Sequence, residues 1–379
     1  MESFLNEQVT SLQISGIRKF FNLVSEYDDV ISLTIGVPDF PTPEHVKEAA
    51  IQAIHNNITT YTHNAGRLDV RRAACAYVQK KYNLAYQDDE VIVTVGASEA
   101  IDISLRTILQ PGDEVILPGP VYPGYEPLIT LSGGKPVHAD VRQNGFKLTA
   151  EVIQTYLSDK TKCIILPYPS NPTGVSLSEE ELQDIANLLK GKNIWVLADE
   201  IYSELTYDRK HVSIAEFIKE QTLVINGLSK SHAMTGWRIG LLFGPKDTTQ
   251  HILKVHQYGV SCATSISQMA ALEALTEGID DALPMRDEYK KRRDYCHNEL
   301  LSMGLNVVQP DGAFYFLVPI PNGEPSFQFA TNLLQQQKVA VVPGDAFSDL
   351  GEGYFRMSYA CSMEQLEKGL NGIRKYLSK

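Results

Sequence analysis

The stretch CIILPYPSNPTGVSLSEEELQDIANLLKGKNIWVLAD at residues 163–199 contains the pattern of a strand, a helix and a second strand. Residues 163–166 and 194–198 are short apolar runs of the kind that form buried strands. Between them, Ser178 and Glu181 have the spacing of a capping box, which marks the start of a helix. Apolar strands that alternate with an amphipathic helix are typical of an α/β fold.

The same alternation recurs on both sides of this stretch. A β-branched run at 91–95 is followed by a helical pattern that ends at Pro111-Gly112. Further apolar runs predict strands at 114–117, 223–225 and 239–243. We therefore expect an α/β fold with a mostly parallel main sheet and helices on both of its faces.

The alternation of predicted strands and helices ends at about residue 275. A long charged helix at 286–301 and short strands at 314–318, 340–342 and 354–359 predict a smaller α+β domain. The predicted division is an N-terminal segment (1–45) that joins the small domain, a large domain (46–278) and a C-terminal small domain (279–379).

The composition is that of an ordinary globular protein. The 379 residues are 43% hydrophobic and 21% charged, and a net charge of −12 argues against a nucleic-acid partner or an anionic membrane surface. No stretch is apolar enough to span a bilayer, and the N-terminus lacks the pattern of a signal peptide. The five cysteines have no Cys-x-x-Cys pair, so we interpret them as reduced core residues. These features predict a cytoplasmic protein.

Several common functional motifs are absent. The chain has no Gly-x-Gly-x-x-Gly, which argues against a nicotinamide-dependent oxidoreductase, and it has no Gly-x4-Gly-Lys-Ser/Thr loop. Residues 96–100 (GASEA) depart from the nucleophile-elbow pattern at their last position. The nine histidines include no His-x3-His pair, and we expect no metal site.

Polar residues instead gather at the carboxyl ends of the predicted strands, where α/β sheets bind ligands. One of them, Lys230, lies in GLSKSHAMTGWRIG at 227–240, directly after a buried strand where a charged amine is costly unless it is used. A lysine with a depressed pKa condenses with aldehydes, and Arg238 is suited to binding a phosphate. An aldehyde and a phosphate together indicate pyridoxal 5′-phosphate as a cofactor. The other residues at these strand ends are Ser98, Asn171 and Asp199.

The segment at 227–240 resembles the lysine signature of class I aminotransferases, which are fold-type I pyridoxal-phosphate enzymes. Within that family the chain is most similar to the bacterial group assigned as N-acetyl-LL-diaminopimelate aminotransferases. The resemblance covers nearly the whole chain and includes IGVPDF at 35–40, YTHNAG at 61–66, SNPTG at 170–174, DEIY at 199–202 and FRMSYA at 355–360.

The resemblance implies a role for each residue around the cofactor ring. Lys230 would hold pyridoxal phosphate covalently and later move the α-proton of the substrate. Asp199 would face the pyridine nitrogen and keep it protonated. Tyr202 and Asn171 would donate hydrogen bonds to the phenolic oxygen, and Tyr122 would stack on the ring.

The resemblance also places the cofactor phosphate at the start of a helix, where backbone amides are free. The residues implied there are Gly96, Ala97, Ser98, Ser229 and Arg238.

Three further residues are implied in substrate binding and assembly, and Asn171 is implied in substrate binding as well. Arg356 matches the arginine that binds the α-carboxylate of the amino acid with two parallel hydrogen bonds. Gly36 resembles the glycine whose backbone approaches the substrate. Tyr61 resembles a residue that reaches the phosphate of the neighbouring subunit, which implies a homodimer with shared active sites.

The implied reaction is a ping-pong transfer of an amino group between an amino acid and a 2-oxo acid, with glutamate and 2-oxoglutarate as one pair. In dedicated aspartate enzymes an arginine from the partner subunit can bind the distal carboxylate, but the corresponding loop YGVSCATS at 258–265 has no arginine. Arg18 and Arg67 are the remaining candidates, although each is more simply a surface or structural residue. An acetylated, longer substrate needs less charge and more room, which favours N-acetyl-LL-diaminopimelate and a role in lysine biosynthesis.

Other activities remain open. An aspartate aminotransferase or a broad-specificity enzyme for aromatic amino acids, methionine or alanine would use the same residues. A pyridoxal-phosphate-dependent carbon–sulfur β-lyase would use the same lysine but eliminate from the β-carbon. A non-catalytic regulator would need an effector domain, and we expect none because the family resemblance begins within the first 20 residues.

Overall fold

The computed structural model of the chain describes residues 4–12 and 16–378. The first three residues, on which the predicted absence of a signal peptide partly rests, lie outside the described residues. Within those ranges, no helix combines the length and the apolar character that a membrane crossing requires.

The main sheet has seven strands in the order β2-β8-β7-β6-β5-β3-β4. Neighbouring strands run parallel except at β8, which is antiparallel to both β2 and β7. This arrangement confirms the expected α/β fold with a mostly parallel sheet. The strands are β2 (Val91–Thr94), β3 (Glu114–Gly119), β4 (Lys135–Asp140), β5 (Thr161–Pro167), β6 (Trp195–Asp199), β7 (Thr222–Gly227) and β8 (Gly240–Phe243).

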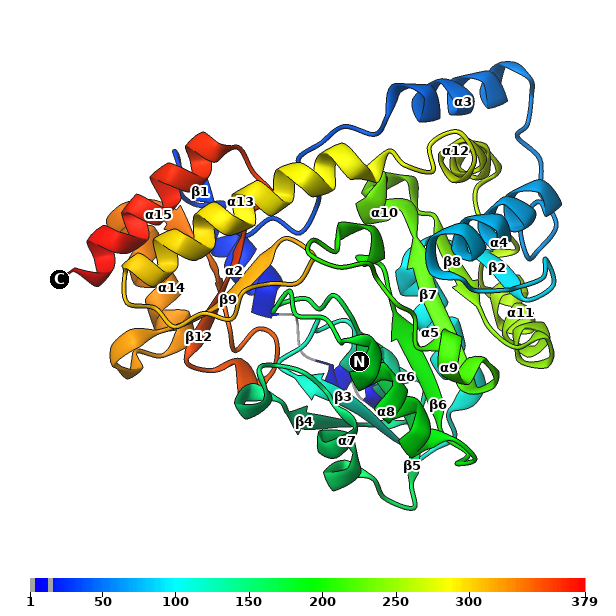
Figure 1. Cartoon of the computed structure of the whole chain (residues 1–379), viewed down its shortest axis with the longest axis horizontal. Helices are drawn as coiled ribbons and strands as arrows, with labels where there is room; N and C mark the ends of the chain where they lie inside the picture. Colours follow the sequence, from blue (N-terminus) through cyan, green and yellow to red (C-terminus); the bar gives the residue numbers. More distant parts are fainter. Residues whose placement is uncertain (1–3, 13–15, 379) are drawn as a thin grey trace.

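Helices cover both faces of this sheet, as Figure 1 shows. Successive residues of a strand point to opposite faces, so Ile164 and Ile165 of β5 belong to two different apolar clusters. The helices of this part of the chain are α3 (Glu44–His55), α4 (Leu68–Tyr82), α5 (Gly96–Ile108), α6 (Tyr125–Leu131), α7 (Ala150–Tyr156), α8 (Glu179–Leu189), α9 (Ala215–Ile218), α10 (Leu228–Ser231), α11 (Lys246–Val260) and α12 (Ser265–Leu275). Among them, α3 packs mainly on α12.

The predicted capping box at the start of α8 is confirmed. The Ser178 side chain accepts a hydrogen bond from the Glu181 backbone N–H at 3.1 Å, and the Glu181 carboxylate accepts from the Ser178 N–H at 2.7 Å. The edge strand β4 was not predicted, because its sequence KPVHAD has no continuous apolar run. An edge strand tolerates a proline and exposed polar residues that a central strand excludes.

The other strands form two smaller sheets, and all of them except β1 follow the main sheet in the chain. The strands β9 (Tyr315–Pro319), β12 (Tyr354–Ser358) and β11 (Val342–Pro343) form an antiparallel sheet, and β1 (Ile31–Ser32) pairs in parallel with β10 (Val339–Ala340). The prediction of one strand at 340–342 is therefore wrong. The chain divides at Val341, because the residues before it pair with the N-terminal segment and those after it pair with β12.

The remaining helices pack around these smaller sheets, except α1, which contacts α6. The long helix α13, yellow in Figure 1, leads away from α12 and packs against α15. The parallel β1–β10 pair ties the N-terminal segment to the C-terminal part of the chain, while the predicted boundaries after residues 45 and 278 stay predictions. The helices are α1 (Glu7–Ser11), α2 (Gly16–Val24), α13 (Ala282–Ser302), α14 (Ser326–Gln337) and α15 (Met363–Leu377).

All five cysteines are free thiols. Cys163, Cys296 and Cys361 are buried, as expected. The prediction is wrong for Cys75 and Cys262, which are partly exposed. Cys75 lies beside the buried face of α4, and Cys262 lies in the connection between α11 and α12.

Candidate active site

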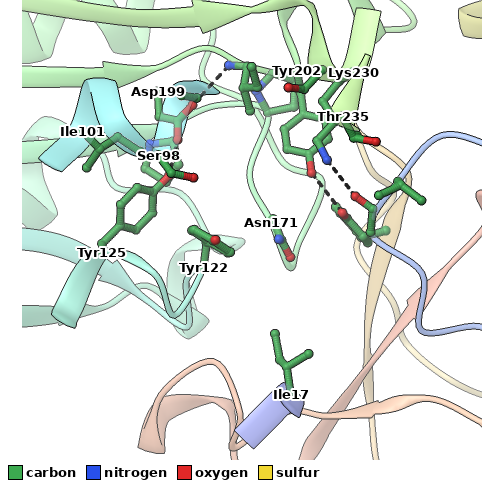
Figure 2. Close-up of a pocket in the computed structure, with 18 of the residues that line it drawn as sticks. Ile17, Ser98, Ile101, Tyr122, Tyr125, Asn171, Asp199, Tyr202, Lys230 and Thr235 are labelled. Carbon is green, nitrogen blue, oxygen red and sulfur yellow. Dashed lines mark hydrogen bonds between the residues drawn. The ribbon is translucent and has the colours of Figure 1, made fainter. Parts of the chain in front are cut away.

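A cavity of about 370 Å³ lies at the carboxyl edge of the main sheet. Strand register places the loops there, because Asp199 at the end of β6 pairs with Pro167 of β5 and with Ile225 of β7. Figure 2 shows Asp199, Ser98 and Tyr125 on one side of the cavity, with Tyr202 and Lys230 on the other. The predicted site residues that line it are Gly36, Ala97, Ser98, Tyr122, Asn171, Asp199, Tyr202, Ser229, Lys230, Arg238 and Arg356.

Lys230 lies in the short helix α10, directly after β7. Its Nζ donates a hydrogen bond to the backbone oxygen of Gly36 at 2.7 Å. Among the described residues it has no carboxylate within ion-pair distance. Burial and the nearby Arg356 guanidinium together lower the pKa of the Lys230 amine to about 8, although the Asp199 carboxylate opposes this shift. Part of the amine is therefore neutral, and so nucleophilic, near neutral pH.

Asp199 is a buried carboxylate held by two neutral donors. Tyr125 donates its hydroxyl hydrogen to Oδ2 at 2.6 Å, and the Ile201 N–H donates to Oδ1 at 3.2 Å. Burial raises the pKa of the Asp199 carboxyl, whereas these two hydrogen bonds oppose that shift. Sequence reasoning missed Tyr125, which is the first residue of α6 and directly follows the Pro-Gly turn after Tyr122.

Arg356 lies on β12 and is 3% exposed. Its Nη1 donates to Asn171 Oδ1 at 3.0 Å and its Nη2 donates to the Thr34 carbonyl at 2.7 Å. Its Nε is buried and has no hydrogen-bond partner in the described part of the chain. A buried cation without a carboxylate partner is costly, so this guanidinium is suited to receiving an anion from the cavity.

Two tyrosine hydroxyls meet behind Lys230. The Oη atoms of Tyr202 and Tyr315 are 2.9 Å apart, and both side chains are buried. Burial and the neighbouring Tyr315 raise the pKa of the Tyr202 phenol well above its usual range, so Tyr202 stays protonated and can donate a hydrogen bond. Sequence reasoning missed Tyr315, because an aromatic residue inside a predicted strand is most simply a core residue.

The helix α5 begins at Gly96, so the free amides of its first turn belong to the predicted phosphate-binding residues. Gly96 does not itself line the cavity. Its φ is +77°, and a Cβ at this position would collide with the Arg238 guanidinium, which packs directly on the turn. Arg238 Nη1 donates to the Thr235 carbonyl at 2.8 Å. No carboxylate of the described ranges pairs with this guanidinium.

Tyr122 and Tyr61 differ in their relation to the cavity. Tyr122 lines it, and its ring meets the Tyr125 ring edge-on with centroids 5.4 Å apart. Tyr61 is 87% exposed and lines a separate surface hollow with His63 and Arg67. A single chain therefore does not bring Tyr61 to the site, and its reach into a partner subunit stays a prediction.

The side of the cavity toward the N-terminal segment is apolar. Ile17 and Phe21 of α2 line it with Val37, and Figure 2 shows Ile17 pointing toward the space below Asn171 and Tyr122. Neither candidate for binding a distal carboxylate lines this cavity. Arg18 is exposed, and Arg67 forms a two-pronged ion pair with Asp69 at 2.6 and 3.0 Å.

Comparisons with known proteins show which family the chain resembles. The sequence model of the family described as "Aminotransferase class I and II" matches residues 28–373. The chain is 61% identical to the "Probable N-acetyl-LL-diaminopimelate aminotransferase" of Bacillus subtilis (strain 168), over 100% of this chain and 97% of the relative. It is 38% identical to the "Aspartate aminotransferase" of Pyrococcus abyssi, over 98% of each chain.

A solved structure shares the fold. The crystal structure of the aromatic aminotransferase from Pyrococcus horikoshii OT3 superposes with a TM-score of 0.90 at 36% sequence identity. The match covers 96% of this chain and 98% of that one.

Proposed function

We propose, since this chain belongs to the class I and II aminotransferase family, that it transfers an amino group between N-acetyl-LL-diaminopimelate and 2-oxoglutarate. The observation that carries the proposal is one cavity that gathers a lysine of lowered pKa, a buried carboxylate and two guanidinium groups. In the described residues, none of the three cations has a carboxylate partner.

This set of residues fits pyridoxal phosphate. A Cβ at Gly96 would have to displace the Arg238 guanidinium, which packs on the turn, so a guanidinium and the free amides of α5 lie together as a phosphate site requires. When bound, pyridoxal phosphate supplies an aldehyde that reacts with amines and a protonated ring that accepts electrons from the substrate α-carbon.

The residues of this chain would hold the cofactor from several directions. Lys230 would bind its aldehyde, and Asp199 would keep the pyridine nitrogen protonated. Tyr202 and Asn171 would donate to the phenolic oxygen, while Tyr122 would cover one face of the ring. The phosphate would be held by Ala97, Ser98, Ser229 and Arg238 at the turn formed by Gly96.

The same cavity would orient the amino acid. Arg356 would bind the α-carboxylate, and Gly36 would approach the substrate with its backbone. In this structure Gly36 also holds the Lys230 Nζ through its carbonyl oxygen. Lys230 Nζ, once released, would take the proton from the substrate α-carbon as a general base.

Two observations support the substrate. The relative that is 61% identical carries the probable assignment to N-acetyl-LL-diaminopimelate. In addition, Ile17, Phe21 and Val37 form an apolar wall, which suits the methylene chain and the acetyl methyl group of a longer substrate. An aspartate or aromatic preference is the main competitor, because relatives and solved structures with those names are between 34 and 38% identical.

The assembly and the location are part of the proposal. We infer a homodimer in which Tyr61 reaches the neighbouring phosphate, and a cytoplasmic enzyme whose large domain spans residues 46–278.

The experiment is an absorbance measurement on the purified protein after incubation with pyridoxal phosphate, followed by L-glutamate. We expect a yellow band that converts to the pyridoxamine form. A panel of amino donors with 2-oxoglutarate should then give the highest kcat/KM for N-acetyl-LL-diaminopimelate.

The control is Lys230→Ala, which should retain no multiple turnover. A higher kcat/KM for aspartate or phenylalanine would replace the proposed substrate but keep the reaction. Formation of pyruvate and ammonia from cystathionine, without transamination, would identify a β-lyase. A protein that stays colourless would contradict the role of Lys230.

A further inference from the structure

Tyr315 lies next to three residues that have different roles in the proposed function, namely Tyr202, Arg356 and Gly36. Its hydroxyl oxygen is 2.9 Å from that of Tyr202, and the centroid of its ring is 4.4 Å from the guanidinium carbon of Arg356. A Cβ built on Gly36 would lie 3.2 Å from the same hydroxyl. The carbonyl oxygen of Gly36 in turn holds Lys230.

The strand register explains why the Tyr315 side chain lies beside Arg356. Arg356 of β12 is paired with Leu317 of β9, two residues after Tyr315. Residues two apart in a strand share a face, so Arg356 and Tyr315 are diagonal neighbours on the same side of the sheet. Tyr315 is only 1% exposed, and this packing leaves its ring little freedom to turn away.

The available donors and acceptors limit which hydrogen bonds the hydroxyls of Tyr202 and Tyr315 can form. A phenol has one hydrogen to donate and can also accept. Among the described residues the Tyr202 hydroxyl has no partner other than Tyr315. If Tyr315 donates to Tyr202, then the hydrogen of Tyr202 is free to point into the cavity.

We propose that Tyr315 is a positioning residue that donates to the Tyr202 hydroxyl and supports the Arg356 guanidinium with its ring. The proposal rests on the proposed function and adds a residue to it. Through its hydroxyl, Tyr315 makes Tyr202 a stronger donor to the phenolic oxygen of the cofactor. Through its ring, it keeps Arg356 oriented for the substrate carboxylate, by a cation–π contact.

Charged groups surround the pair on several elements, so the test must isolate the hydroxyl. Lys230 of α10, Asp199 of β6 and Arg356 of β12 all contribute to the local field. The variant Tyr315→Phe leaves each of these charges and the aromatic ring in place, and it removes a single oxygen atom.

The first readout is the pH titration of the visible absorption band of the holoenzyme, which requires no turnover. A weaker donor at the phenolic oxygen leaves more electron density on the cofactor, so Tyr315→Phe should raise the pKa of this band by about 0.5 to 1 unit. Tyr202→Phe should raise it more, and the double variant should add nothing to Tyr202→Phe.

The second readout separates the ring from the hydroxyl. Tyr315→Leu removes the cation–π contact and should raise KM for the amino acid about 5- to 30-fold, whereas Tyr315→Phe keeps KM within about threefold. The matched control is Tyr359→Phe. It also removes a buried hydroxyl, which lies 3.2 Å from that of Tyr207, but it does not line the cavity and should leave both readouts unchanged.

An unchanged band pKa in Tyr315→Phe would overturn the role of the hydroxyl, and an unchanged KM in Tyr315→Leu would overturn the role of the ring. Because Tyr315→Phe is almost isosteric, circular dichroism should show it folded. Failure of the proposed function itself would look different, since the wild-type protein would then show no visible band, or a band without transamination of N-acetyl-LL-diaminopimelate.

Discussion

At the scale of residues, the cavity concentrates positive charge that the protein itself does not neutralise. Lys230 and Arg356 lie close enough that the positive charge of one disfavours the charged form of the other. Arg238 also disfavours the charged form of Lys230. Most buried charges are paired within the protein, since an unpaired one costs several kcal/mol. Here the phosphate and the carboxylates of ligands would supply the missing negative charge, so the site is destabilising until it is filled.

The variant Lys230→Met should therefore stabilise the protein in the absence of cofactor. The pKa of Lys230 is lowered to about 8 from 10.5, so below pH 8 the amine opposes folding by on the order of 3 kcal/mol. Between pH 8 and 10.5 the unfolded chain binds the proton and the folded one does not, so wild-type stability rises with pH there.

The measurement is urea unfolding of both apo proteins from pH 7 to pH 10.5. We expect the advantage of Lys230→Met to be largest at pH 7 and to shrink as the pH rises above 8. An advantage that is independent of pH would show that lost packing or hydration, rather than charge, sets the difference.

At the scale of elements, two connections at the edge of the main sheet build the site. The turn between β2 and α5 places Gly96 against Arg238, and the loop after β5 carries Asn171 to Arg356. The loop is held in shape by Gly174, whose φ is +71° and whose absent Cβ leaves room for the carbonyl oxygens of Gly312 and Tyr315. Both connections depend on backbone conformations that favour glycine.

Substitution at the first of these turns should affect the cofactor specifically. Gly96→Ala adds a Cβ that collides with Arg238 and should weaken the affinity for pyridoxal phosphate at least about tenfold, the loss of one charge-assisted hydrogen bond. The matched control is Gly112→Ala, which has a φ of +91° but meets no atom within 4 Å.

Both variants place alanine in the left-handed region and should lose roughly 1 to 2 kcal/mol of stability. Only Gly96→Ala should change the cofactor titration, which absorbance or fluorescence quenching can follow. Equal cofactor affinities in the two variants would show that the contact between the turn and Arg238 has no functional effect.

The capping box of α8 should matter for stability alone. Ser178→Ala removes the side-chain acceptor for the Glu181 N–H and should cost about 1 kcal/mol, measured by denaturant unfolding. Because Ser178 does not line the cavity, kcat and KM should stay at wild-type values. A change in KM would show that α8 communicates with the loop that carries Asn171.

At the scale of the whole molecule, large aromatic side chains remain exposed away from the cavity. Tyr61 and Tyr258 are each 87% exposed, and they come from segments far apart in the chain. Isolated exposed residues are ordinary, but Tyr61 also belongs to the segment that the family resemblance assigns to a neighbouring active site. These observations fit the proposed homodimer, in which each chain completes the site of the other.

Hybrid dimers test this arrangement directly. One chain would carry Lys230→Ala and the other Tyr61→Ala, mixed after reversible dissociation. If Tyr61 serves the partner, then one of the two sites in each hybrid has both native residues and should bind pyridoxal phosphate with wild-type affinity.

The Tyr61→Ala homodimer provides the comparison, because both of its sites lack the tyrosine. If the hybrid binds the cofactor as weakly as this homodimer does, Tyr61 acts within its own chain. A monomer in sedimentation experiments would contradict the shared site altogether.

The sequence by itself determined every strand of the main sheet except β4, and it identified half of the residues that line the cavity. Strands such as β5 and β6 are continuous apolar runs that bury both faces, so their positions follow from composition alone. Asp199 and Lys230 follow such strands directly, and the carboxyl ends of parallel strands meet at one edge. Whether these residues carry the predicted roles is for the experiments above to decide.

Only the tertiary structure decided which side chains touch. Tyr125 reaches Asp199 across 74 residues of chain, and Tyr202 reaches Tyr315 across 113. No local pattern encodes such a contact, because it depends on how separate elements pack and in which register. The division at Val341 also depends on packing. Val339 and Ala340 pair with β1, whereas Val342 and Pro343 pair with β12. Local periodicity therefore predicts elements, whereas the contacts that tune the site arise from packing between them.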